Sequence, residues 1–152
     1  MRPSKPVSAL DAHLGYWLRL VSNHVSHRFQ MKVEQLGVTV AEWVVLRALL
    51  EGALKPSEIA KRIGLTRGAI SKLLDRLVQK GLVVSEADGV DQRAQQITLS
   101  PAGRKLVPKL AALADENDAE CFEHMPPQAQ ARLLATLKRF AEQHSIDGVP
   151  LD

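Results

Sequence analysis

Cationic and hydroxyl side chains are concentrated between residues 55 and 80, where their types suit contact with a nucleic acid. Seven Lys or Arg residues stand there against the two acids Glu58 and Asp75, whereas the whole chain of 152 residues has a formal net charge of only +3. Arginine and lysine donate hydrogen bonds to guanine O6 and N7 or to phosphate, and serine donates to either. A local cationic surface on a nearly neutral protein therefore indicates phosphate contact.

Apolar periodicity in the same stretch predicts two helices joined by a tight turn. A short helical pattern over about 57–63 ends at Gly64, and a longer one follows over 66–80. In the longer one, apolar residues recur at three- and four-residue steps, which is typical of a half-buried helix. Two such helices form a helix-turn-helix, whose second helix enters the DNA major groove. Its apolar stripe consists of Ile70, Leu73, Leu74, Leu77 and Val78.

Two short strand patterns follow the second helix directly. Residues 82–86 and 95–99 carry the convincing strand signals, and residues 87–94 between them are rich in turn formers. We therefore expect a hairpin whose charged tip contains Asp91 and Arg93. A helix-turn-helix followed by a hairpin is a winged helix.

Further helical patterns flank this core on both sides. One covers about 9–33, and another opens at Thr39, where Glu42 three residues later completes a capping box. Ser100 and Pro101 have the residue types of an N-cap and a first helical position, and they open a helix that runs to about 121–124. A last helical pattern follows the prolines at 126 and 127.

These elements predict a mainly α fold, with about six helices and a two-stranded β-wing. Its core is a winged helix-turn-helix over 39–100, between an N-terminal tail and dimerisation helix at 1–38 and C-terminal dimerisation helices at 101–152. The outer helices carry too many apolar residues to stand alone beside so small a core. We therefore expect a homodimer in which they interdigitate between two subunits.

Composition and motifs narrow the class of protein. At 45% hydrophobic and 24% charged residues the chain can bury a core. The single cysteine suits a reducing compartment, and we find neither a signal peptide nor an apolar run near the roughly 20 residues of a membrane span. These features predict a cytoplasmic protein without a membrane partner. No nucleotide-binding, nucleophile or zinc-protease motif and no paired carboxylates are present, so we expect no enzyme and no cofactor.

The order of elements and three local motifs resemble the MarR family of bacterial transcription factors, over about residues 9–143. The motifs are L-K-P-S-E-I-A-K-R-I-G-L, T-R-G-A-I-S-K-L-L-D-R-L-V-Q-K-G-L-V and D-Q-R-A-Q-Q-I-T-L-S-P-A-G. The Asp-x-Arg pair of the third, Asp91 and Arg93, is specific to that family, although Gln92 stands where members often have another arginine. The resemblance implies a homodimer on a pseudo-palindromic operator in double-stranded DNA. Many members are repressors that small aromatic acids or phenols release, and some respond to oxidants or metal ions.

The candidate DNA contacts lie on the two helices of the helix-turn-helix and on the hairpin. Arg67 and Lys72 suit guanine or phosphate, Thr66 caps the helix beside an anion, and Arg93 suits a narrow minor groove with Asp91 holding its guanidinium. The bland alternative is a solvated charged face with a weak surface ion pair. The full set is Ser57, Lys61, Arg62, Thr66, Arg67, Gly68, Ser71, Lys72, Arg76, Asp91 and Arg93.

A candidate ligand site comes from aromatic and polar residues of the first two helices. Planar ligands favour aromatic walls with a few placed donors, and the family resemblance puts the usual effector groove there. We expect an aromatic or heteroaromatic acid as effector, although the tryptophans could equally be core residues. The candidates are His13, Tyr16, Trp17, Asn23, His24 and Trp43.

Two other hypotheses remain open. His24 and His27, with Cys121 or His124 from another helix, could make the protein a metal- or redox-responsive regulator on the same scaffold, although the sequence fixes no third ligand. A winged helix can also be a protein-interaction module without DNA, and the cationic stretch argues against that hypothesis.

Overall fold

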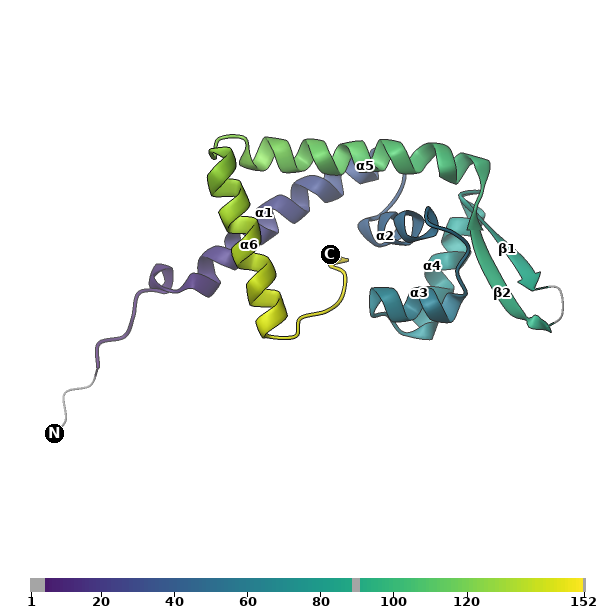
Figure 1. Cartoon of the computed structure of the whole chain (residues 1–152), viewed down its shortest axis with the longest axis horizontal. Helices are drawn as coiled ribbons and strands as arrows, with labels where there is room; N and C mark the ends of the chain where they lie inside the picture. Colours follow the sequence, from purple (N-terminus) through teal and green to yellow (C-terminus); the bar gives the residue numbers. More distant parts are fainter. Residues whose placement is uncertain (1–4, 89–90, 152) are drawn as a thin grey trace.

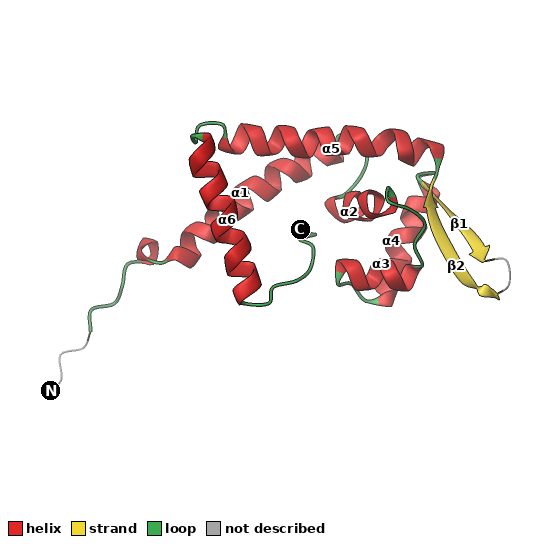
Figure 2. Ribbon diagram, in the orientation of Figure 1, coloured by secondary structure: helices red, strands yellow, loops and turns green. Residues whose placement is uncertain are grey.

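The computed structural model describes residues 5–88 and 91–151, and of residues 88 and 91–94 it describes the backbone alone. Figure 1 shows a long helix that spans the molecule, with the winged helix under one end and the last helix turning away from the other. Figure 2 shows that helices dominate, with one small sheet at the extremity. In chain order the elements are a 3-10 turn η1 (Leu10–Ala12), α1 (Leu14–Glu34), α2 (Val40–Leu49), α3 (Pro56–Ile63), α4 (Arg67–Gln79), β1 (Val83–Asp88), β2 (Asp91–Leu99), α5 (Pro101–Phe122) and α6 (Pro127–Gln143).

Local capping residues set the limits of the helix-turn-helix as the sequence predicted. Gly64 ends α3 in the left-handed region at φ 80°, which glycine adopts without steric cost. Thr66 then caps α4, because its Oγ1 accepts a hydrogen bond from Ala69 N at 3.2 Å. The predicted capping box at Thr39 and Glu42 is also present, with distances of 3.0 and 3.1 Å. The turn between α3 and α4 is therefore fixed locally.

One apolar core joins α2, α3, α4 and the wing. Leu46, Ile59, Ile70, Leu77 and Ile97 are each at most 2% exposed. Burying a side chain of this size contributes about 1.5–3 kcal/mol, so these contacts fix how α4 lies on the domain. The apolar stripe predicted for α4 is therefore its core face, apart from the half-exposed Val78.

The wing is an antiparallel hairpin in which Val83 faces Leu99 and Ser85 faces Ile97. Leu54 adds a short bridge on the other side of Ile97, with backbone hydrogen bonds of 2.8 and 3.1 Å. The second strand begins at residue 91 rather than at 95, so the predicted start of this strand was wrong and Asp91 and Arg93 lie within β2. Asp88 pairs with Asp91 and Ala87 with Gln95, with a shift of register between the two pairs.

Helix α5 begins where it touches the end of the wing. Ser100 caps it, since its Oγ accepts from Gly103 N at 3.0 Å and donates to Gly81 O at 2.6 Å. A Cβ atom on Gly103 would stand 2.1 Å from Leu82 O, so only glycine permits this approach. The sequence predicted the cap and missed the reason for the glycine.

Helices α1 and α5 pack against one another (Figure 1), and ion pairs join them. Arg28 and Lys32 of α1 reach Glu120 of α5 at 2.8 and 3.1 Å. The first helix begins at Leu14 and not at about residue 9, because residues 10–12 form a separate 3-10 turn. After α6 the chain returns toward α2, where Val149 and Pro150 line a hollow beside Trp43.

Candidate DNA-binding surface

The polar face of α4 exposes cationic and hydroxyl side chains. Arg67, Ser71 and Lys72 are exposed, whereas Ile70 and Leu74 of the same helix are buried. Because Ile70 and Leu74 pack against the core, they hold α4 in place and leave these three side chains accessible to a partner. Guanidinium, ammonium and hydroxyl groups in this arrangement can donate to base edges and phosphates.

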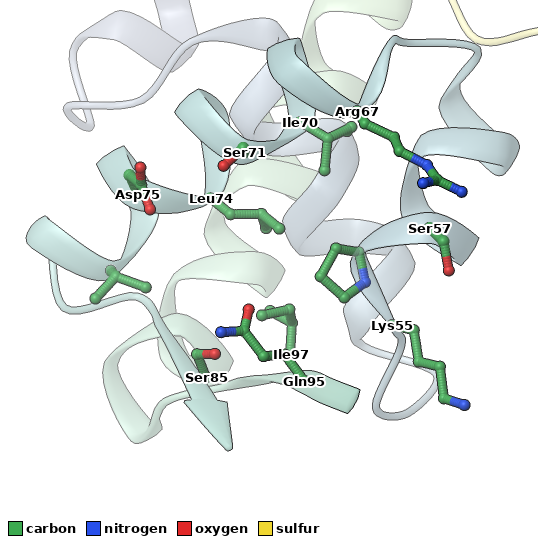
Figure 3. Close-up of a pocket in the computed structure, with 12 residues that line it drawn as sticks. Lys55, Ser57, Arg67, Ile70, Ser71, Leu74, Asp75, Ser85, Gln95 and Ile97 are labelled. Atoms are coloured by element: carbon green, nitrogen blue, oxygen red, sulfur yellow. The ribbon is translucent and has the colours of Figure 1, made fainter. Parts of the chain in front are cut away.

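A groove of about 440 Å³ separates α4 from the wing. Figure 3 shows Arg67 and Ser57 on one side of it and Ser85 and Gln95 on the other. The buried side chains of Ile70, Leu74 and Ile97 form its floor. The groove therefore places polar groups of α3, α4 and the wing around one cavity.

Both ends of α3 and the start of α4 hold further candidate contacts of the helix-turn-helix. Ser57, Lys61 and Arg62 are exposed, as are Thr66 and Gly68. Within the described residues, apart from its chain neighbours and the backbone of its own helix, no heavy atom lies within 4 Å of the place where a Cβ of Gly68 would stand. Packing within the chain therefore gives no reason for this glycine, and the space beside it is open to a partner.

Arg76 differs from the other candidates because it has a partner within the protein. Its Nε lies 3.8 Å from Oε1 of Glu42, and its side chain is 56% exposed. Glu42 is fully buried, and its Oε2 also accepts from Lys80 Nζ at 2.7 Å. Sequence reasoning missed this cluster, because Glu42 and Lys80 are 38 residues apart and the capping box already explained the glutamate.

The predicted wing contacts, Asp91 and Arg93, lie in β2, and their side chains are outside the described part of the structure. Their backbone places them near the free end of the hairpin (Figure 1).

The structure does not bring the predicted ligand residues together. Asn23, Trp43 and His24 line three different hollows. Trp17 packs edge-on against Tyr16 and donates from Nε1 to Asp11 O at 2.8 Å. His13 precedes α1 and lies 3.1 Å from Leu10 O through Nδ1.

The histidines and the cysteine are also divided between surfaces. His24, Cys121 and His124 line one hollow, but His27 lines another with Asn23. Within residues 5–88 and 91–151, no three His, Cys, Asp or Glu side chains are grouped closely enough to hold a metal ion. The ion pairs between α1 and α5 shift the pKa values of their members. The hydrogen bond from Arg28 lowers the pKa of Glu120, and the hydrogen bonds to Glu120 raise the pKa of Arg28 and of Lys32.

A helix-turn-helix that runs into a two-stranded wing, with an exposed cationic second helix, defines the winged-helix class of proteins. Within the described ranges no helix is both long and apolar enough to cross a membrane. A sequence model of the MarR family matches residues 36–94, from the turn before α2 to the wing.

Solved structures match most of the chain. BpsR from Bordetella bronchiseptica, described as regulated in DNA binding by 6-hydroxynicotinic acid, has 23% identity and a TM-score of 0.76 over 90% of this chain and 98% of its own. A probable transcriptional regulator from Pseudomonas aeruginosa has 27% identity and a TM-score of 0.75, over 87% and 99% of the two chains. MepR from S. aureus, in a complex with DNA, has 25% identity and a TM-score of 0.74, over 86% and 98%.

Residues 36–94 thus match the MarR family of winged-helix transcriptional regulators, and solved structures of such regulators share the fold of most of the chain. The family and the fold are those of transcriptional regulators, which are not enzymes.

Proposed function

We propose that this protein is a homodimeric repressor that binds a pseudo-palindromic operator and releases it when a small aromatic or heteroaromatic acid binds. The observation that carries the proposal is the exposed cationic face of α4, with Arg67 and Lys72 free of any ion pair within the described residues. MepR, which has 25% identity to this chain, forms a complex with DNA. In this account α4 reads the major groove, and the wing with Asp91 and Arg93 reaches the flanking minor groove.

Support for a homodimer comes from apolar side chains that a single chain leaves in water. Leu14 and Trp17 of α1 are 82% and 49% exposed, and Leu134 and Phe140 of α6 are 54% and 53% exposed. Soluble monomers rarely expose large contiguous apolar surfaces. The α1 and α6 helices of two subunits would cover one another and set the distance between the two α4 helices.

For the effector we propose the hollow beside Trp43. Phe29 and Trp43 give it aromatic walls and Ser26 a hydroxyl, and its volume is about 230 Å³. Because pockets for drug-sized ligands are roughly 300–1,000 Å³, this volume favours a compound with a single ring. BpsR is regulated by 6-hydroxynicotinic acid, a ligand of this size. Such an acid would act by stabilising a dimer whose α4 helices do not match the half-site spacing.

The test begins by selecting duplexes from a randomised DNA library with the purified protein. Fluorescence anisotropy on the selected duplex then measures affinity with and without a panel of aromatic acids, and light scattering measures the mass in solution. We expect a dimer, a palindromic selected sequence, and release by at least one acid. Failure to enrich any sequence at low salt would overturn the proposal and favour a protein-interaction module.

A further inference from the structure

The carboxylate of Glu42 is a fully buried charge at the point where α2 meets the end of α4. Its Oε2 accepts from Thr39 N at 3.0 Å and from Lys80 Nζ at 2.7 Å, and its Oε1 lies 3.0 Å from the same ammonium. In a capping box the carboxylate only has to accept a hydrogen bond from the backbone N–H of the N-cap residue, here Thr39, and it needs neither burial nor a cation beside it. The bonds from Lys80 are charge-assisted and among the strong ones, so Glu42 has a second role.

Lys80 connects three segments through one ammonium group. It is the C-terminal cap residue of α4, and its Nζ also donates to Gly37 O at 2.9 Å, in the turn between α1 and α2. The C-terminal end of the recognition helix is therefore tied both to α2 and to the turn by which α1 enters the domain. By contrast, Thr66 at the N-terminal end of α4 caps the helix through Ala69, so this contact lies entirely within the helix-turn-helix.

Arg76 stands one turn after Lys72 on the exposed side of α4 and can turn either inward or outward. Its Nε lies 3.8 Å from Glu42, which is too far for a hydrogen bond, whereas Lys80 makes the close contacts. If Arg76 left for a phosphate, Lys80 would still neutralise the buried carboxylate. Breaking a buried ion pair is costly when it leaves one charge without a partner. The movement of Arg76 from Glu42 to a phosphate avoids this cost, because Lys80 stays with Glu42.

We propose that Glu42 is a positioning residue for the recognition helix. It holds the end of α4 to the α1–α2 turn through Lys80, and it holds Arg76 until a DNA phosphate takes the guanidinium. The inference rests on the proposed function, since it presumes that α4 reads an operator. It identifies the physical link by which a movement of α1 would tilt α4.

The test compares the Glu42→Gln variant with wild type on two probes, the selected duplex and a scrambled duplex of the same length and composition. Glutamine keeps an oxygen for Thr39 N but loses the charge that holds Lys80 and Arg76. We expect affinity for the selected duplex to fall about tenfold, while affinity for the scrambled duplex stays within about threefold of wild type. Lys80→Met should reproduce this loss of discrimination, and Lys80→Arg should largely restore it.

Glu51→Gln is the matched control, because it removes an exposed carboxylate paired with Arg47 just beyond the same helix. It should leave both affinities unchanged, and circular dichroism should show that all variants are folded. A Glu42→Gln protein that is folded and keeps the wild-type ratio of the two affinities would overturn the positioning role. If the wild type itself prefers neither duplex, the proposed function fails instead.

The exchange of Arg76 has its own readout, the dependence of affinity on salt. Arg76→Gln should lower the slope of log K against log salt by about one for each subunit bound, because one phosphate contact is lost. An unchanged slope would mean that Arg76 stays with Glu42 in the complex and would overturn the exchange.

Discussion

Replacing Gly68 by alanine should stabilise the free protein and weaken its binding to DNA. Alanine is favoured over glycine in a helix by about 0.5–1 kcal/mol. No heavy atom lies within 4 Å of the added Cβ, so nothing in the chain offsets that gain. Gly68 lies in the first turn of α4, between Arg67 and Ala69, where the DNA backbone would approach. The new methyl group would displace a contact there, at a cost comparable to one mismatched base pair, about 1–3 kcal/mol.

Gly103→Ala is the comparison variant, since it makes the same change in the first turn of α5. Here the Cβ would stand 2.1 Å from Leu82 O and 3.2 Å from Leu99 Cδ2, and the backbone oxygen cannot swing aside. Overpacking typically costs 1–3 kcal/mol, and we expect the loss to reach about 3 kcal/mol despite the helical preference of alanine. Urea unfolding followed by circular dichroism measures both stabilities, and anisotropy measures binding to the selected duplex. A Gly68→Ala protein that binds as tightly as wild type would refute the role given to this glycine.

Three further predictions concern the tail, an ion pair and a cap. Removing residues 146–152 should shift the emission of Trp43 to longer wavelength, measured in a Trp17→Phe background, because Val149 and Pro150 no longer cover the hollow beside it; unchanged emission would contradict that placement. Because the pKa of Glu120 is lowered in the folded protein, its ion pairs stabilise the fold fully above the carboxyl's ordinary pKa of 4.5, and this stabilisation is lost as the pH falls through the lower folded value. NMR titration should therefore find the midpoint of Glu120 below 4.5. Glu120→Gln should flatten the dependence of the free energy of unfolding on pH in the same range. Thr66→Ala should lower the free energy of unfolding by about 1 kcal/mol, since Ala69 N loses its acceptor, and an unchanged urea midpoint would count against the cap.

Much of the winged helix could be predicted from sequence because its signals are local. The apolar period over 66–80, Gly64 and the caps at Thr39, Thr66 and Ser100 act within a few residues of themselves, so they fix helix limits without knowledge of the fold. The start of β2 was missed because turn-forming residues also tolerate a strand when a partner strand pairs with them.

The contacts between distant segments could not be predicted in the same way. Nothing in the local sequence indicates that Lys80 reaches Glu42, or that a backbone oxygen of Leu82 excludes a side chain at Gly103. The predicted ligand set failed to converge because residues chosen for their chemistry lie on different faces of α1, and Trp43 faces the C-terminal tail. Only the packing of the helices decides which faces meet.

The central claim is that the exposed face of α4 reads DNA, and the most direct measurement is the affinity of wild type and Arg67→Ala for the selected duplex across a salt series. The account predicts tight binding by wild type that weakens steeply with salt. It predicts that Arg67→Ala remains a dimer by light scattering but binds at least about fivefold more weakly, with a shallower salt slope. Equal affinity and equal slope for the two proteins would contradict the claim that this face contacts DNA.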